Sequence, residues 1–173
     1  MDFKAELKKY QSYVDEKLDE YFKEENSYEK RLRESMRYSL LAGGKRVRPI
    51  LMLATYRLFR EDYERCLPFA LGMEMVHNAS LIHDDMPCID NDDFRHGKPT
   101  NHKMYDECTA LLAGDALFNY SNIVITDDLR ADLDIKSISM KIMALNEFVK
   151  VKDRMICGEY FDTVSEGQIL TLE

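Results

Sequence analysis

The chain has 173 residues, of which 45% are hydrophobic and 32% charged, and its net charge at neutral pH is −8. This length and composition suit one globular domain with a sizeable core. The acidic balance argues against nucleic acid as the main partner, because neutralising phosphates needs a basic face. Glycine and proline are scarce, with 7 and 4 residues, which favours long helices over a sheet with many turns.

The cysteines and the N-terminus indicate where the protein works. The four cysteines are widely spaced and form no CxxC pair, so we expect reduced thiols in a cytoplasmic protein. The first 18 residues are charged throughout and lack an apolar signal core. No stretch approaches the roughly 18 apolar residues that a membrane span needs, so we expect none.

The first third of the chain predicts three helices. Apolar residues recur every three or four positions over residues 3–21, which predicts an amphipathic helix. Asn26 and Glu29 match a capping box for a second helix, which a glycine pair at residues 43–44 ends. A proline suits the start of a third helix, over residues 50–59.

The rest of the chain predicts three more helices. A fourth covers about residues 65–83, and a polar loop over about 87–103 follows. We expect a fifth helix over about 106–125, an acidic turn over 127–134 and a sixth helix over about 135–161. Strand alternation persists nowhere, so the predicted fold class is all-α, with mostly antiparallel long helices.

Carboxylates crowd the stretch LIHDDMPCIDNDDFR. Asp84 and Asp85 end an apolar helix, and Asp90 lies six residues after Asp84. Pro87 breaks the helix between them, which would bring Asp90 back towards Asp84. Such hard oxygen ligands suit Mg²⁺, which often bridges protein carboxylates and substrate phosphate. A solvated acidic loop is the alternative, whereas a calcium EF-hand loop fits poorly because Arg95 stands where that loop needs glycine.

Cations crowd the stretch GGKRVRP at residues 43–49. The glycines free the backbone, and the following helix offers its positive N-terminus to an anion. Arg48 can grip phosphate oxygens as a fork, while Lys45 acts as a point charge. The alternative is a basic turn whose cations complement the end of the preceding helix.

Histidines lie near both stretches. His77 lies on a largely apolar helix, where a core or rim histidine is the alternative to a ligand. His96 and His102 add titratable groups beside the carboxylates, with an exposed loop as the alternative. One segment thus offers a diphosphate grip and another offers metal carboxylates, and Mg²⁺ that bridges carboxylates to a diphosphate polarises a leaving group.

Three segments, in order and spacing, resemble trans-isoprenyl diphosphate synthases of the bacterial farnesyl and geranylgeranyl type: GGKRVRP, EMVHNASLIHDDMPCIDNDDFRHGKPT and LLAGDAL. The resemblance covers about residues 7–162 and implies the isoprenoid synthase fold. It implies a Mg²⁺-dependent prenyltransferase that condenses isopentenyl diphosphate with an allylic diphosphate to a C15–C20 product. It further implies a homodimer.

The resemblance assigns roles to the acidic stretch. Asp84, Asp85 and Asp90 match the first aspartate-rich motif, which holds Mg²⁺ on the allylic diphosphate. Arg95 matches an arginine that contacts the same diphosphate, so Asp84, Asp85 and Arg95 are the expected catalytic residues.

The resemblance also assigns roles to the basic stretch. Lys45, Arg48 and His77 match the residues that grip the diphosphate of isopentenyl diphosphate. His96 stands where the family usually has a second arginine, so we expect a weaker or pH-dependent diphosphate contact there.

Other positions depart from the family. Gly158-Glu159 replaces its Gly-Gln pair, whereas Asp162 still matches. The downstream lysine-threonine motif and the second aspartate-rich motif are absent, and the acidic run at residues 127–132 lies too early, so we expect a solvated turn there. Residues 1–173 are therefore expected to form a single helical domain, the N-terminal part of a synthase.

Product length depends on the helix before the first aspartate. Ala79 stands where farnesyl-forming members often carry an aromatic floor of the chain pocket, and Ser80 follows it. Small residues there favour a C20 over a C15 product, although Met75 and Val76 can restore a floor.

The alternative to an active enzyme is a truncated or decayed, non-catalytic synthase-like helical subunit. Glu159, His96 and the absent second metal motif favour it. Terpene cyclases share the fold and an aspartate-rich motif, but the basic set with Lys45 and Arg48 argues for a second diphosphate site.

Overall fold

The computed structural model describes residues 2–22 and 28–167, and the chain divides into two compact units, Met1–Asp127 and Asp128–Glu173. Most described residues are helical, which confirms the all-α class. The elements follow in this order: α1 (Phe3–Tyr21), α2 (Lys30–Leu40), α3 (Val47–Arg57), the 3-10 helix η1 (Tyr63–Cys66), α4 (Leu67–Asp84), β1 (Phe94–Arg95), β2 (Lys98–Pro99), α5 (Asn101–Met104), α6 (Glu107–Ala131) and α7 (Ile135–Ser165).

Helices α1 and α2 begin by different means. The Asp2 side chain accepts a hydrogen bond from the backbone N–H of Lys4 at 3.0 Å and so caps α1. At α2, Glu29 is the N-cap but forms no side-chain cap bond, and Asn26 of the predicted capping box lies outside the described residues. Helix α2 ends at Leu40 with Leu41 as its C-cap, before the predicted glycine stop, and Gly43 and Gly44 follow in the loop with φ of +106° and +132°.

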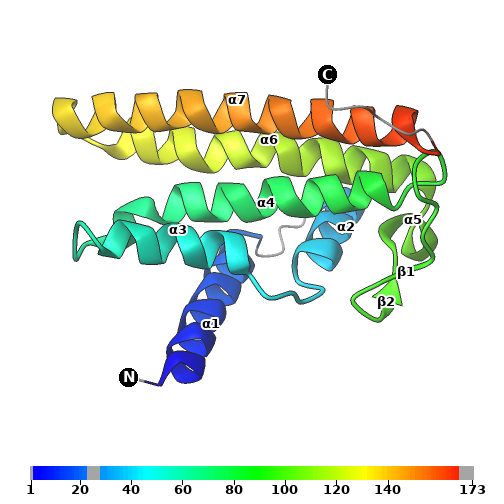
Figure 1. Ribbon diagram of the computed structural model, residues 1–173, viewed down its shortest axis with the longest axis horizontal. Coiled ribbons are helices and arrows are strands. Elements are labelled where there is room, and N and C mark those ends of the chain that lie inside the picture. The colour runs from blue at the N-terminus through cyan, green and yellow to red at the C-terminus, as the bar shows by residue number, and fades with distance from the viewer. Residues whose placement is uncertain (1, 23–27, 168–173) are drawn as a thin grey trace. The chain divides into compact units, whose positions relative to one another are not determined.

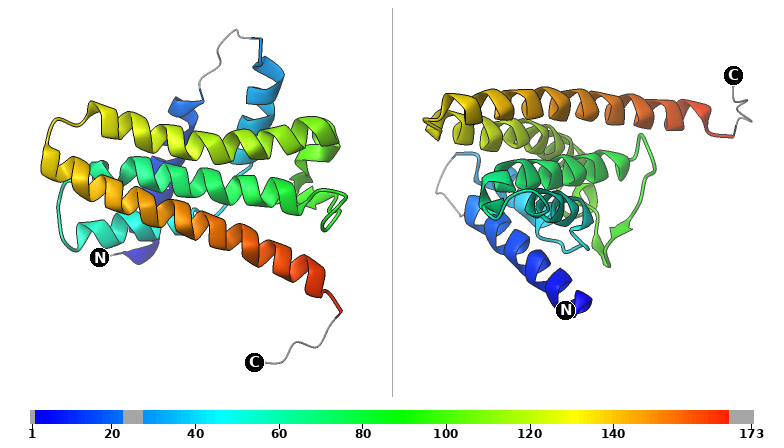
Figure 2. Two further views of the ribbon diagram at one scale, coloured as in Figure 1. Left: turned by 90° about the horizontal axis from the view of Figure 1, so that it is seen from above. Right: turned by 60° about the vertical axis from the view of Figure 1, so that its left-hand side comes forward.

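Helix α4 is the centre of the first unit. Ten of its residues are buried, which fits a helix that is apolar on nearly all sides. It contacts α1, α2 and α3, and α3 runs alongside it (Figure 1). Helix α6 also runs alongside α4 in all views (Figures 1 and 2), where the His83 ring lies 3.1 Å from the Leu111 carbonyl oxygen.

The segment after α4 has more structure than the predicted loop. Strands β1 and β2 form a two-residue antiparallel hairpin, in which Arg95 pairs with Lys98. His96 and Gly97 both have positive φ, as a tight two-residue hairpin turn requires. The short helix α5 follows, and the strands are too short to leave an alternating sequence pattern.

The expected acidic turn is largely helical, which corrects the prediction. Helix α6 continues to Ala131, so its last residues form the second unit together with α7. The Lys141 ammonium lies 2.7 Å from the Asp128 carboxylate and 2.8 Å from that of Asp132. Asp134 caps α7 by accepting hydrogen bonds from two backbone N–H groups. These carboxylates are therefore held by partners rather than solvated.

Two further observations concern the cysteines and the apolar character of α6. The four cysteines are free thiols. Among the described residues, α6 is long and apolar enough to cross a membrane by length and composition alone, which the sequence pattern had not suggested. Core helices pass the same test, and α6 carries seven buried residues.

Candidate active site

A cavity of about 370 Å³ opens where the loop before α3 meets α4. The loop contributes Lys45, the first turn of α3 contributes Arg48, and α4 contributes His77. The turn of the β1–β2 hairpin contributes His96. The structure therefore brings four of the predicted substrate-binding residues to one cavity, and all four are cationic or can become so.

Arg48 and His77 contact each other across this cavity. A guanidinium nitrogen of Arg48 lies 3.3 Å from Nε2 of His77, while the Ser80 hydroxyl holds the His77 carbonyl at 2.8 Å. Burial lowers the pKa of His77, and the charge of Arg48 lowers it further. The neutral imidazole is thus favoured, and a bound anion would reverse this preference.

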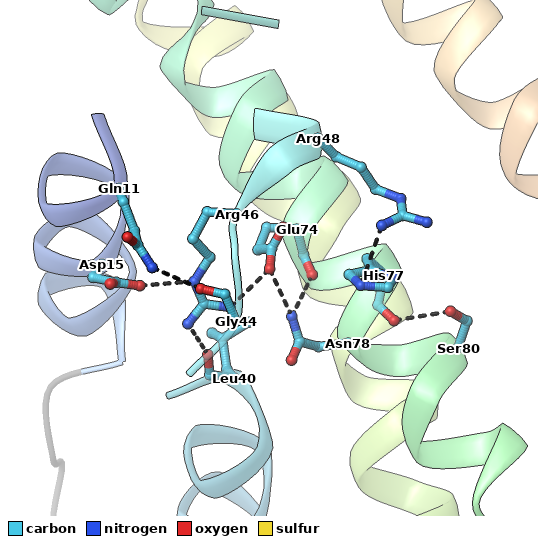
Figure 3. A network of polar contacts seen from close by, with 10 residues as sticks. All are labelled: Gln11, Asp15, Leu40, Gly44, Arg46, Arg48, Glu74, His77, Asn78 and Ser80. Carbon is cyan, nitrogen blue, oxygen red and sulfur yellow. Dashed lines mark hydrogen bonds and ion pairs between the residues drawn. The ribbon is translucent and has the colours of Figure 1, made fainter. Parts of the chain in front are cut away.

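Arg46 and Glu74 form a buried ion pair in the wall of the cavity, which the sequence did not predict. Nη1 of Arg46 lies 2.7 Å from Oε1 of Glu74, and both side chains are almost fully buried. Figure 3 shows Arg46 between Asp15 and Glu74, with Arg48 extending towards His77. A glutamate inside the apolar stretch LGMEMV was the available signal, because buried carboxylates need a partner.

The acidic cluster gathers around one arginine. Nε of Arg95 donates to Oδ1 of Asp85 at 2.7 Å, and Nη2 donates to Oδ2 of Asp84 at 3.1 Å. The Asp92 carboxylate lies 3.5 Å from the same Nη2. Burial raises the pKa of Asp85, and the Arg95 hydrogen bond opposes that rise. The predicted catalytic residues Asp84, Asp85 and Arg95 are therefore in direct contact.

The predicted metal set is only partly assembled. Within residues 2–22 and 28–167, no three His, Cys, Asp or Glu side chains are grouped as a metal site, so Asp90 does not join Asp84 and Asp85 in one. The Asp90 backbone N–H instead donates to the Asp84 carbonyl at 3.0 Å. Asp84 and Asp85 nevertheless fit Mg²⁺, because their hard oxygens already converge on one cation, the guanidinium of Arg95.

A second, smaller cavity of about 30 Å³ shares part of its lining with the first. Asp85 and Arg95 line it from the acidic side. It shares Asn78, Leu81 and His96 with the larger, basic cavity. The basic loop and the acidic stretch therefore flank the same part of α4, with His96 at the boundary.

The remaining predicted residues lie elsewhere. Ala79 is fully buried and Ser80 half-buried, and neither is among the described residues that line the two cavities. His102 is buried and its Nδ1 lies 3.2 Å from the Thr100 hydroxyl, so the exposed-loop alternative is wrong for it. Glu159 and Asp162 lie on α7, in the second unit.

Comparisons with known proteins identify the family of the chain. The chain matches the Polyprenyl synthetase family over residues 29–172. It is 44% identical over 146 residues to a farnesyl diphosphate synthase of Geobacillus stearothermophilus, covering 82% of this chain and 48% of the relative. It is 46% identical over 138 residues to a geranylgeranyl diphosphate synthase of Cyanophora paradoxa, covering 78% and 44%.

Solved structures show the same likeness. An FPP/GFPP synthase of Zymomonas mobilis superimposes with a TM-score of 0.88 at 33% identity, over 98% of this chain and 60% of that one. A geranylgeranyl pyrophosphate synthetase of Pyrococcus horikoshii gives 0.83 at 33% identity, over 96% and 48%. The chain spans about half the length of the curated relatives it matches. It belongs to the polyprenyl synthetase family.

Proposed function

We propose that this chain carries the first half of a Mg²⁺-dependent trans-prenyltransferase site, which joins isopentenyl diphosphate to an allylic diphosphate. One observation carries the proposal: the cationic cavity and a second cavity, lined by Asp85 and Arg95, share the lining residues Asn78, Leu81 and His96. A site for two diphosphates needs cations for one and metal-binding oxygens for the other, side by side. The relatives named as farnesyl and geranylgeranyl diphosphate synthases support it.

The chain's residues divide the work by charge. Lys45 and Arg48 bind the diphosphate of isopentenyl diphosphate, and the half-buried His77 contacts Arg48 and supplies a ring nitrogen beside it. Asp84 and Asp85 would hold Mg²⁺, which neutralises the allylic diphosphate so that it leaves more readily. These groups position both substrates and keep water from the reacting carbons.

Arg95 changes partners in this proposal. In the structure its guanidinium pairs with Asp84 and Asp85. If these carboxylates held Mg²⁺ instead, Arg95 would be available to contact the allylic diphosphate. His96 lies on the wall shared by the two cavities, where it would add a further contact to the diphosphate.

The finer assignment is a C20 product. Ala79 places a small side chain where farnesyl-forming members often carry an aromatic floor, which favours the longer prenyl chain, whereas the buried side chain of Met75 can restore a floor. We assign the shorter C15 product to the case in which Met75 ends the pocket.

A non-catalytic subunit is the second candidate. The absence of a three-carboxylate metal group among the described residues favours it, as does His96 at a position where the family usually has arginine. Such a protein would bind diphosphate through Lys45 and Arg48 but would not ionise an allylic substrate.

Activity and binding measured together separate these candidates. The intact gene product is incubated with labelled isopentenyl diphosphate, Mg²⁺ and dimethylallyl, geranyl or farnesyl diphosphate, and the products are sized by chromatography. We expect turnover that the double variant Asp84→Ala, Asp85→Ala abolishes. Asp93→Asn is the matched control, because Asp93 lies in the same stretch but pairs with Lys103 on the surface.

The possible results decide between the candidates. Turnover that survives in the double variant overturns the metal role. Diphosphate binding without any turnover supports the non-catalytic subunit. A protein that neither binds nor turns over contradicts both.

A further inference from the structure

In the sequence, Arg46 lies between Lys45 and Arg48, the two cations of the cavity. Its side chain makes contacts different from theirs. It is 3% exposed, and its guanidinium reaches three helices. Nε donates to Asp15 of α1, Nη1 to Glu74 of α4 and Nη2 to the carbonyl of Leu40, the last residue of α2, each at 2.7 Å. Figure 3 shows this arrangement. Three separate elements are thus fixed to one side chain.

The backbone at Arg46 also has a specific conformation and specific hydrogen bonds. Its φ is +51°, in the left-handed region that a non-glycine residue adopts only at a cost of about 1 kcal/mol. As the N-cap of α3, its carbonyl accepts the N–H of Ile50 at 3.1 Å. Gln11 of α1 holds the neighbouring Gly44 carbonyl at 2.7 Å. The side-chain contacts of Arg46 therefore maintain the loop geometry that places Lys45 and Arg48 at the cavity.

Glu74 gives Arg46 an electrostatic task as well. This carboxylate is 3% exposed and lines the cavity that would take a diphosphate. An unpaired buried carboxylate there would repel an anionic ligand. Arg46 cancels its charge, and the Asn78 amide donates a further hydrogen bond to it at 3.3 Å.

The ion pair acts on His77, one turn of α4 further along. Glu74 raises the pKa of His77, whereas Arg48, Arg46 and His96 lower it. The pKa of His77 thus depends in part on whether the charge of Glu74 is compensated.

We infer that Arg46 is the positioning residue of the diphosphate cavity: it fixes the loop that presents Lys45 and Arg48, and it neutralises Glu74 inside the same cavity. This inference rests on the proposed function, because it takes the ligand of the cavity to be a diphosphate. Arg46 acts through its neighbours and is distinct from the residues that grip the ligand.

Three variants and a control test it in the intact gene product. Binding of inorganic diphosphate and of isopentenyl diphosphate is measured by calorimetry without Mg²⁺, after urea unfolding has shown that each variant is folded. We expect Arg46→Met to bind about tenfold more weakly. The double variant Arg46→Met, Glu74→Gln should recover part of that loss. Arg60→Met is the control, because Arg60 pairs with Asp62 on the surface at 3.4 Å.

Glu74→Gln alone distinguishes charge from packing and serves where Arg46→Met does not fold. It removes the negative charge of Glu74 from the cavity while Asp15 still pairs with Nε of Arg46, so we expect diphosphate to bind about tenfold more tightly. A merely structural ion pair predicts equal or weaker binding. In NMR titrations without ligand, the pKa of His77 should fall in Glu74→Gln and rise in Arg46→Met.

The outcomes separate this inference from the proposed function. If the wild-type protein binds diphosphate and both single variants bind within twofold of it, the positioning role is wrong while the cavity assignment stands. If the wild-type protein binds no diphosphate, the proposed function fails and the role of Arg46 fails with it. Weakened binding by Arg46→Met together with tighter binding by Glu74→Gln supports both.

Discussion

Nε of Arg95 lies 2.7 Å from Oδ1 of Asp85, which is one of the predicted metal ligands. The carboxylate is buried and the guanidinium is partly exposed, so the pair closes the acidic cluster from the solvent side. Arg95 also reaches Asp84, which makes one arginine the counter-ion of two predicted metal ligands. This contact has consequences for stability and for metal binding that can be measured separately.

Replacing Arg95 with Gln should destabilise the metal-free protein and strengthen metal binding. Asp85 would lose its charged partner while buried, which costs about 1–3 kcal/mol in the free energy of unfolding by urea. A divalent ion would no longer have to displace a cation, so Mn²⁺ affinity measured by EPR without diphosphate should rise about tenfold.

Arg31→Gln is the control for this experiment. Arg31 pairs with Asp106 at 3.1 Å, but both side chains are largely exposed, so its loss should cost under about 1 kcal/mol and leave Mn²⁺ affinity unchanged. Equal Mn²⁺ affinity in Arg95→Gln and the wild type would show that Arg95 does not compete for the carboxylates.

His77 should make stability depend on pH. Its pKa is lower in the folded than in the unfolded protein, mainly because of burial and secondly because of Arg48. At pH values between the folded and the unfolded pKa of His77, the unfolded chain binds more protons than the folded chain. The contribution of His77 to stability is therefore complete above about pH 6.5 and is lost as the pH falls to the folded pKa. Urea unfolding from pH 5 to 7.5 should therefore show a steeper rise in the wild type than in His77→Gln.

Ligand binding should reverse the shift. A diphosphate beside Arg48 and His77 favours the imidazolium, so binding near neutral pH should take up protons. Calorimetry in buffers of different ionisation enthalpy measures this uptake, and His77→Gln should reduce it. Identical proton uptake in both proteins would contradict a role for His77 in the cavity.

The sequence alone predicted the parts of this fold that depend on periodicity and on the family motifs. The helices around Phe3, Met36 and Phe69 appear where apolar spacing placed them, and Lys45, Arg48 and His77 meet in one cavity. Helix ends were less predictable.

The features that the sequence did not predict depend on contacts between distant residues. Helix α6 outruns its predicted end because Lys141, on the next helix, compensates the carboxylates in its last turn and just beyond it. Arg46 and Glu74 are 28 positions apart in the sequence, so their pairing could not be predicted without the fold. The predicted return of Asp90 towards Asp84 is present in the backbone, where the Asp90 N–H donates to the Asp84 carbonyl at 3.0 Å, but the described residues form no three-carboxylate metal group.

Gly114 should be intolerant of even a methyl group. A Cβ at this position of α6 would lie 2.2 Å from Nε2 of His83, whose ring packs against the helix and contacts the Leu111 carbonyl at 3.1 Å. Gly114→Ala therefore forces the ring away, and we expect a net loss of about 1–2 kcal/mol in urea unfolding, after the gain in helix propensity is subtracted.

Two variants test this reason. His83→Ala combined with Gly114→Ala removes the clash and should recover most of the loss. Gly158→Ala in α7 is the matched control, because a Cβ there meets nothing within 4 Å, and we expect unchanged or slightly higher stability. Equal effects at both glycines would indicate that the ring yields freely.

Lys141 should control the ionisation of the carboxylates that join α6 to α7. Its hydrogen bond to Asp132 is the main reason that the pKa of this carboxyl is depressed, and the Ser137 hydroxyl adds to it. A depressed pKa stabilises the fold above the ordinary carboxyl pKa, and this contribution is lost as the pH falls through the folded value.

The variant Lys141→Met should therefore return the pKa of Asp132 towards its ordinary range, which ¹³C NMR of the carboxyl carbons measures directly. Acid unfolding of the variant should also depend less steeply on pH. Lys150→Met, which removes a surface pair with Glu147 at 2.9 Å, is the control and should leave Asp132 unchanged. A depressed pKa that persists in Lys141→Met would assign the effect to Ser137 and the backbone N–H of Asp134, because these are the remaining donors that lower it.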